Sequence, residues 1–174
     1  AADSFIPADV NISQRNVTVS TCGIVPRMRE LADEKLQITL ALSLHASSQE
    51  KRKELMPVAN RYGLSEVLDA CRYYFEQTGR RLTFEYSLVG GVNDTAEDAR
   101  ELARLIKPLR GHVNLIPVNP IKERDYVQSG HAAVLEFKNK LEKSGINVTI
   151  RREIGRDIDG ACGQLRKSYM DTEK

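Results

Sequence analysis

The segment Gln37-Ile-Thr-Leu-Ala-Leu-Ser-Leu44 decides the fold of this chain. It is a nearly continuous apolar run whose length suits a strand. Strands that are apolar on both faces lie inside parallel sheets, because helices cover both faces of such sheets. The segment therefore predicts a buried parallel strand.

Further strands and helices alternate on both sides of this segment. The predicted strands are residues 16–20, 37–44, 82–88, 113–117 and 147–152, and the predicted helices are residues 25–35, 64–77, 95–107 and 132–143. Strand–helix alternation with short connections implies parallel strands and right-handed crossovers. The predicted fold class is α/β in one domain, and an open sheet and part of a (β/α) barrel both fit.

Turn and cap signals fill the intervals between these elements. Pro26 lies in the first turn of its helix, where proline is well tolerated. Ser47 and Glu50 have capping-box spacing and open a short basic helix that Pro57 ends. Residues 121–130 are predicted to form an irregular polar loop.

Composition excludes some classes of protein. The chain has 174 residues, 41% of them hydrophobic and 29% charged, which suits a folded domain. No apolar run approaches the roughly 18 residues that cross a bilayer, and the first residues do not resemble a signal peptide. We therefore expect a cytoplasmic protein without a membrane partner.

Charge by itself does not indicate a nucleic-acid partner. The net charge is +2, and basic residues cluster only locally, at 51–53, 80–81 and 151–152. Such clusters are usually solvated surface.

The cysteines do not predict a metal site. The chain has three, Cys22, Cys71 and Cys162, and no two have the short spacing of a zinc or iron–sulfur motif. Cys71 lies on the apolar stripe of a helix and is expected in the core, and Cys22 is expected to pack as a small residue.

Polar residues recur where the predicted strands end. Ser20 ends the first strand, Ser43-Leu44-His45 ends the second, and Asn119 follows the fourth. The loop after the last strand contains Cys162 between Gly160 and Gly163. Because parallel α/β folds collect their ligands at the carboxyl ends of strands, these residues predict a site for a small polar ligand.

Each of these residues also has a simpler interpretation. Ser20 could cap the following helix, and His45 could be a hydrogen-bonded structural histidine. Asn119 before Pro120 is a common turn element. Cys162 differs, since a cysteine in a glycine-flanked loop is typically exposed and reactive.

Several segments, in this order and spacing, resemble one family. They are 17–23 (VTVSTCG), 42–46 (LSLHA), 79–81 (GRR) with 84–86 (FEY), 112–120 (HVNLIPVNP), 147–152 (NVTIRR) and 157–165 (DIDGACGQL). The chain is similar in these segments to radical S-adenosylmethionine (SAM) enzymes that methylate carbon 2 of an adenosine in 23S ribosomal RNA and, in the bacterial prototype, of a tRNA. A related enzyme methylates carbon 8 of the same ribosomal adenosine.

The resemblance implies a role for each predicted site residue. Ser20, Ser43, Leu44, His45 and Asn119 would contact SAM. Cys162 would be the catalytic cysteine, which receives a methyl group and then bonds covalently to the RNA base. This route suits carbon 2 of adenine, which is electrophilic and cannot itself attack the methyl group of SAM.

The sequence also departs from the family. Its C-x-x-x-C-x-x-C motif, which holds a [4Fe–4S] cluster, is absent, as are a further resolving cysteine and a Gly-Glu segment that binds SAM. Residues 17–165 are therefore expected to be the C-terminal half of a TIM-like radical SAM barrel, with 1–16 a connecting segment and 166–174 a polar tail. We expect the isolated chain to be inactive, to need the missing N-terminal half, and to self-associate through exposed strand edges.

Two other interpretations remain open beside carbon-2 and carbon-8 methylation. A half-barrel could serve as a non-catalytic binding module. A different (β/α)-barrel enzyme with a cysteine nucleophile would need a base near Cys162.

Overall fold

The computed structural model describes residues 12–118 and 127–151 as strands and helices that alternate along the chain. Short 3₁₀ turns cover Gln14–Asn16, Pro57–Asn60 and Lys107–Leu109. In chain order the main elements are β1 (Thr18–Thr21), α1 (Val25–Asp33), β2 (Thr39–Ser43), α2 (Gln49–Leu55), α3 (Leu64–Thr78), β3 (Leu82–Gly90), α4 (Ala96–Ile106), β4 (His112–Pro117), β5 (Val127–Gln128), α5 (His131–Lys143) and β6 (Asn147–Ile150).

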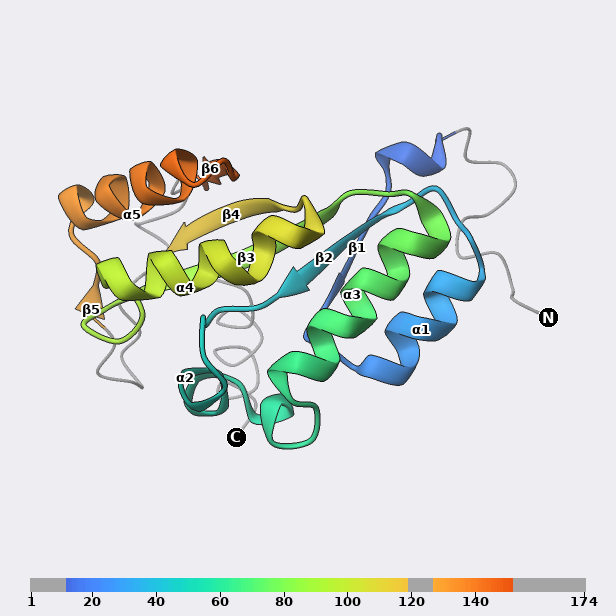
Figure 1. Ribbon diagram of the computed structural model, residues 1–174, viewed down its shortest axis with the longest axis horizontal. Helices are drawn as coiled ribbons and strands as arrows, with labels where there is room; N and C mark the ends of the chain where they lie inside the picture. Colours follow the sequence, from blue (N-terminus) through green and yellow to red (C-terminus); the bar gives the residue numbers. More distant parts are fainter. Residues whose placement is uncertain (1–11, 119–126, 152–174) are drawn as a thin grey trace, which may run out of the picture.

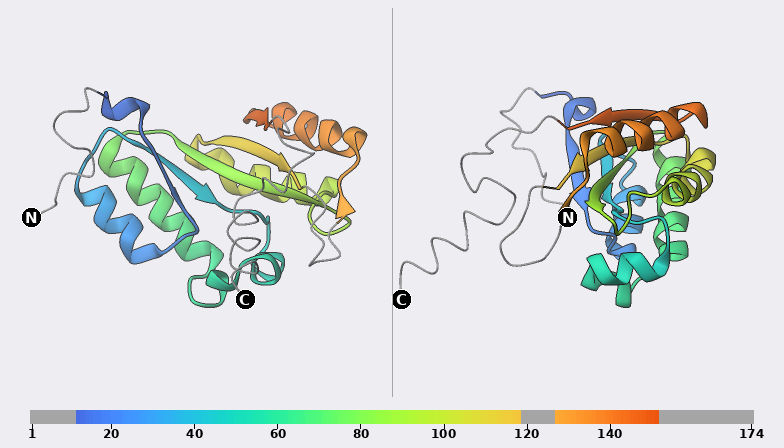
Figure 2. Two further views of the ribbon diagram at one scale, coloured as in Figure 1. Left: turned by 180° about the vertical axis from the view of Figure 1, so that it is seen from behind. Right: turned by 90° about the vertical axis from the view of Figure 1, so that its left-hand side faces the viewer.

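The strands form one parallel sheet with the order β1-β2-β3-β4-β6. Each neighbouring pair is parallel, as the alternation of strands and helices predicts. Figure 1 shows α1, α3 and α4 along one face of this sheet, and the view from behind in Figure 2 shows the strands in front of them. Among the described residues no helix lies on the opposite face, so the sheet has a covered and an uncovered side.

The core lies between the sheet and the helices. Leu40 and Leu42 of β2 are fully buried and pack with Phe84 of β3 and with Val67 and Cys71 of α3. Ala41, on the other face of β2, is also buried. The middle of this segment is thus buried on both faces, as predicted, although helices of the described residues cover only one of them. The core position of Cys71 is confirmed.

The predicted end of the third strand and the predicted 121–130 loop are corrected by the structure. β3 continues to Gly90, past its predicted end, because Val89 and Gly90 pair with β5 in an antiparallel ladder. β5 itself lies within the predicted loop, of which residues 119–126 lie outside the described part of the chain. A ladder of two residue pairs leaves no periodicity that a sequence pattern could reveal.

The predicted cap of the short basic helix is displaced by one residue. Ser48, not Ser47, is the N-cap of α2, and its hydroxyl oxygen accepts a hydrogen bond from the backbone N–H of Lys51. Ser47 is buried and donates its hydroxyl to Asp98 instead. None of the helices in the described residues is long and apolar enough to span a membrane.

Candidate functional site at the carboxyl ends of the strands

Parallel pairing brings the predicted site residues of β1 and β2 to one edge of the sheet. Ser20 pairs with Ala41, and Ser43 lies two residues further along β2, so the two serines share a face. That face is the uncovered one, because the neighbouring Leu40 and Leu42 point into the core. Ser20 is exposed and Ser43 is half-buried. Both hydroxyls can therefore reach a ligand at this edge.

Strand β2 ends in a left-handed turn at His45. The backbone of His45 has φ +58°, which residues other than glycine rarely adopt. The N–H groups of Leu44 and His45 both donate to the carbonyl oxygen of Glu85, at 3.0 and 3.2 Å. The carbonyl of a single β3 residue therefore holds this turn from one side.

The imidazole ring of His45 is neutral and has a defined tautomer. The backbone N–H of Ser87 donates to Nδ1 of His45 at 3.1 Å, so in the neutral ring the proton sits on Nε2. Burial, and then the nearby charge of Arg52, lower the pKa of His45 to about 4. At neutral pH the ring can offer a single uncharged N–H donor to a ligand.

Arg52 is buried next to the end of β1, although the sequence placed it in a solvated basic cluster. Its side chain is 0% exposed, and its Nη2 donates to the carbonyl oxygen of Cys22 at 2.7 Å. Nη1 donates to the carbonyl oxygen of Tyr62 at 3.5 Å, and Nε has no partner among the described residues. Burial lowers the pKa of Arg52. The prediction of a solvated residue is wrong here because α2 turns this side chain toward the β1 end.

A row of polar side chains crosses the uncovered face at the level of Ser43. Ser43, Glu85, Asn114 and Thr149 occupy matching positions on β2, β3, β4 and β6. Nδ2 of Asn114 donates to a carboxylate oxygen of Glu85 at 3.0 Å, and the Thr149 hydroxyl donates to Oδ1 of Asn114 at 3.0 Å. Sequence reasoning missed this row. The period-two alternation of residues 83–87 with Glu85 on the polar side was the signal that could have found it.

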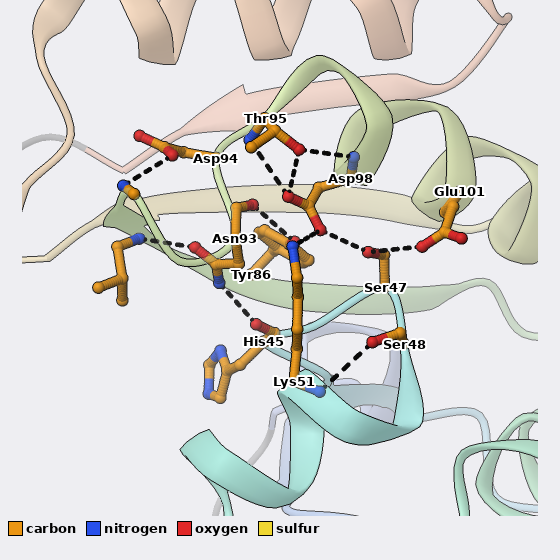
Figure 3. A network of polar contacts seen from close by, with 12 residues as sticks. His45, Ser47, Ser48, Lys51, Tyr86, Asn93, Asp94, Thr95, Asp98 and Glu101 are labelled. Carbon is orange, nitrogen blue, oxygen red and sulfur yellow. Dashed lines mark hydrogen bonds and ion pairs between the residues drawn. The ribbon is translucent and has the colours of Figure 1, made fainter.

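A second polar network ties α4 to the turn after β2 (Figure 3). The carboxylate of Asp98 accepts hydrogen bonds from Ser47 at 2.9 Å, from Lys51 at 2.6 Å and from the Thr95 hydroxyl at 2.5 Å. Nearby, the buried amide of Asn93 donates to the carbonyl oxygen of His45. These hydrogen bonds fix the position of the turn that follows β2.

The structure separates the predicted site residues into two groups. It brings Ser20, Ser43 and His45 to one edge, whereas the side chain of Leu44 is fully buried, which leaves only its backbone for a ligand. Asn119 and Cys162 lie outside the described residues. The alternative role of Ser20 as a cap of α1 is wrong, because the N-cap of that helix is Ile24 and no side chain caps it.

Residues 12–118 and 127–151 contain no clustered set of metal-binding side chains. No cluster of three or more histidine, cysteine or acidic side chains there could hold a metal ion. The described residues therefore do not fit an iron–sulfur cluster. The hydroxyls of Ser20 and Ser43 and the neutral N–H of His45 do fit the hydroxyl and nitrogen acceptors of a nucleoside such as that in SAM.

Comparison with known proteins gives closely related sequences. The chain is 68% identical over 162 residues to a probable dual-specificity RNA methyltransferase RlmN from Lachnospira eligens, covering 93% of this chain and 46% of the relative. It is 58% identical over 164 residues to a protein of the same name from Clostridium perfringens, covering 94% of this chain and 47% of the relative. The chain thus spans about half the length of the curated relatives it matches. No family model matches it.

Two solved structures share the fold. A radical SAM methyltransferase from Sphaerobacter thermophilus is 45% identical, with a TM-score of 0.84, over 88% of this chain and 45% of that one. A domain of a pyruvate-formate lyase-activating enzyme from Bacteroides vulgatus has a TM-score of 0.62 at 17% identity, over 78% of this chain and 80% of that one. The second likeness concerns the fold alone.

Fold and sequence together match the chain to part of a radical SAM methyltransferase. Within that class its sequence matches a segment of the dual-specificity RNA methyltransferases of the RlmN type.

Proposed function

We propose that this chain is the C-terminal, SAM-binding half of a radical SAM RNA methyltransferase that methylates carbon 2 of an adenosine in 23S rRNA and of a tRNA adenosine. One observation carries the proposal. Ser20, Ser43 and the neutral His45 all lie toward the carboxyl ends of β1 and β2, in a chain that is 68% identical to part of a probable RNA methyltransferase. In this proposal residues 17–165 form the barrel half, flanked by a connecting segment and a polar tail.

The described residues bind and orient the cofactor. The hydroxyls of Ser20 and Ser43 and the Nε2–H of His45 would hold the nucleoside part of SAM against the uncovered face of the sheet. Because His45 is neutral at physiological pH, it adds no positive charge beside the sulfonium group. When bound, SAM supplies the methyl group and the adenosyl radical precursor.

The remaining roles belong to residues outside the described part of the chain. Asn119 would complete the SAM contacts, and Cys162 would accept the methyl group on its sulfur and then bond to the base. The [4Fe–4S] cluster would be held by cysteines of the complete protein, since this chain has only three, widely spaced. A ribosomal or transfer RNA substrate implies a cytoplasmic enzyme.

The experiment joins this chain to the N-terminal half of the Lachnospira eligens relative. After anaerobic reconstitution, the chimera is incubated with SAM and either a 23S rRNA fragment or tRNA, and nucleosides are identified by mass spectrometry. We expect 2-methyladenosine from the chimera. From the Cys162→Ala chimera we expect no methylated product, although it should still cleave SAM to 5′-deoxyadenosine.

Two outcomes would contradict the proposal. An inactive chimera beside an active parent enzyme would show that the chain cannot supply the barrel half, and normal methylation by Cys162→Ala would remove that residue from the mechanism. Formation of 8-methyladenosine would instead establish the carbon-8 alternative. The parent enzyme and its own cysteine variant serve as matched controls.

A further inference from the structure

Asn93 is a fully buried asparagine in the loop that follows β3. Its side chain is 0% exposed, and all of its hydrogen-bonding groups are engaged. Nδ2 donates to the carbonyl oxygens of His45 and Ser87, both at 2.7 Å, and Oδ1 accepts from the backbone N–H of Val89 at 2.8 Å. Figure 3 shows the Asn93 amide pointing at the backbone of His45. One side chain thus joins the ends of β2 and β3.

The backbone of Asn93 is itself held by a buried group. The hydroxyl of Tyr86, which is 0% exposed, donates to the carbonyl oxygen of Asn93 at 2.9 Å. Burial raises the pKa of Tyr86, so this hydroxyl stays protonated and remains a donor. The amide of Asn93 is therefore fixed in place.

The bond from Asn93 to His45 acts on a strained position. His45 adopts φ +58°, a conformation that is unfavourable for a residue with a Cβ atom. On the strand side of this turn, the carbonyl oxygen of Glu85 accepts from the N–H groups of Leu44 and His45. On the other side, the Asn93 amide donates to the carbonyl oxygen of His45. Without the Asn93 donor, the carbonyl oxygen of His45 would lose its buried partner and the turn could relax toward ordinary extended backbone.

We infer that Asn93 is a positioning residue for the cofactor-binding segment Ser43–His45. Both hydrogens of its amide are used on backbone carbonyls, so it has no donor left for a ligand and acts only through the turn at His45. This inference rests on the proposed function, because the ligand that the turn serves is SAM.

The test uses the chimera described above and three variants. Asn93→Asp keeps the size and the acceptor oxygen but has at most one donor, the O–H of a protonated carboxyl group, in place of two, and Asn93→Ala loses the side chain. Thr78→Val is the matched control. It removes a buried hydroxyl that donates to the Tyr74 carbonyl at 2.7 Å. This hydroxyl lies at the opposite end of the sheet from the cofactor-binding segment.

The readouts are the dissociation constant for SAM, measured anaerobically well below the melting temperature, and the KM and kcat for methylation. We expect both Asn93 variants to weaken SAM binding by about tenfold, because each weakens the buried hydrogen bond that holds His45 in its left-handed backbone conformation. KM for SAM should rise while kcat at saturating SAM and RNA affinity change little. Thr78→Val should lower the melting temperature and leave the SAM dissociation constant within about twofold.

A rescue experiment separates positioning from general stability. In a His45→Gly background the left-handed turn costs little, because glycine adopts it freely. Asn93→Asp should therefore weaken SAM binding less in that background than in the parent chimera. Equal losses in the two backgrounds would contradict the inference.

Failure of the inference and failure of the proposed function give different results. If the parent chimera binds SAM and folded Asn93→Asp binds it equally well, the inference is overturned and the proposed function stands. If the parent chimera does not bind SAM, the proposed function fails and the inference with it. Should Asn93→Ala not fold, Asn93→Asp, which keeps nearly the same shape, decides the question.

Discussion

Among single residues, Gly23 occupies a position that strongly favours glycine. It follows Cys22 at the end of β1 with φ +101° and is buried against Arg52 and Val67. A Cβ atom there would lie 2.9 Å from Nη2 of Arg52 and 3.2 Å from a methyl group of Val67. The conformation therefore favours glycine, and a methyl group would also displace the Arg52 guanidinium group.

We predict that Gly23→Ala lowers the free energy of unfolding by about 2 kcal/mol or more, through backbone strain and overpacking. Gly130→Ala is the matched control, because a Cβ atom there meets nothing within 4 Å and φ is −59°. Because Gly130 is the N-cap of α5, where alanine is disfavoured, that change should cost about 0.5–1 kcal/mol, less than Gly23→Ala. Urea denaturation of the two variants measures the difference, and equal losses would show that the Gly23 turn relaxes.

His45 makes the stability of the fold depend on pH. Its pKa is lowered to about 4 in the folded chain, whereas an unfolded histidine has a pKa of about 6.5. Between these values the unfolded chain binds a proton that the folded chain does not. We therefore predict that the free energy of unfolding falls as the pH is lowered from 6.5 to 4.

Urea titrations at several pH values in this window measure the effect. His45→Asn, which tolerates the left-handed turn but does not titrate, should lose less stability over the same range. In NMR titrations the ring should titrate near pH 4, and Arg52→Met should raise this pKa while leaving it below 6.5, since burial is the larger cause. A ring that titrates near 6.5 in the parent chain would contradict the prediction.

At the scale of elements, the N-terminus of α4 is fixed to α2 through Asp98. Asp98 forms a capping box with Thr95 and also accepts from Lys51, which lies 47 positions earlier in the chain. The carboxylate is 2% exposed, while Lys51 is 34% exposed. Burial alone would raise the pKa of Asp98, but the hydrogen bonds from Lys51, Thr95 and Ser47 outweigh it and lower the pKa.

We predict that Asp98→Ala destabilises the chain by about 3 kcal/mol, because it leaves several donors without their acceptor. Asp69→Ala is the control. Asp69 forms an ion pair with Arg72 in which the two side chains are 57% and 53% exposed, respectively. This pair should contribute less than about 1 kcal/mol to stability. Denaturant unfolding of both variants tests the difference. Similar losses of unfolding free energy would contradict the prediction, because Asp98 would then contribute no more than an exposed ion pair.

At the scale of the whole molecule, β1 and β6 are the two outermost strands of the parallel sheet within the described residues. Within the described residues β1 pairs only with β2, and β6 pairs only with β4. The carbonyl of Val17 accepts from Thr39 of β2, so by alternation the N–H of Thr18 points away from the sheet. Unpaired edge groups of this kind are templates for pairing with another chain.

We predict that the isolated chain self-associates as its concentration rises, which sedimentation velocity measures. Thr18→Pro removes an outward N–H and should shift the equilibrium toward monomer, whereas Thr18→Val keeps the N–H and should not. A clean monomer at high concentration, or equal association by both variants, would contradict pairing through the β1 edge.

The arrangement of the sheet could be predicted from the sequence because it depends on local periodicity. The apolar run at 37–44, the alternation of strands and helices, and the stripe that contains Cys71 predict a parallel sheet packed against helices. Parallel pairing then requires Ser20 and Ser43 to lie at one edge. These inferences need only the side-chain periods of strands and helices.

Contacts between distant parts of the chain were decided only by the tertiary structure. The carbonyl oxygen of His45 accepts a hydrogen bond from Asn93, which lies 48 positions away, and the buried Arg52 donates to the carbonyl oxygen of Cys22, which lies 30 positions away. Ser47 looks like a cap within its own segment, but it bonds to Asp98 instead. A local pattern cannot contain these partners, because each is brought into place only when the sheet has formed.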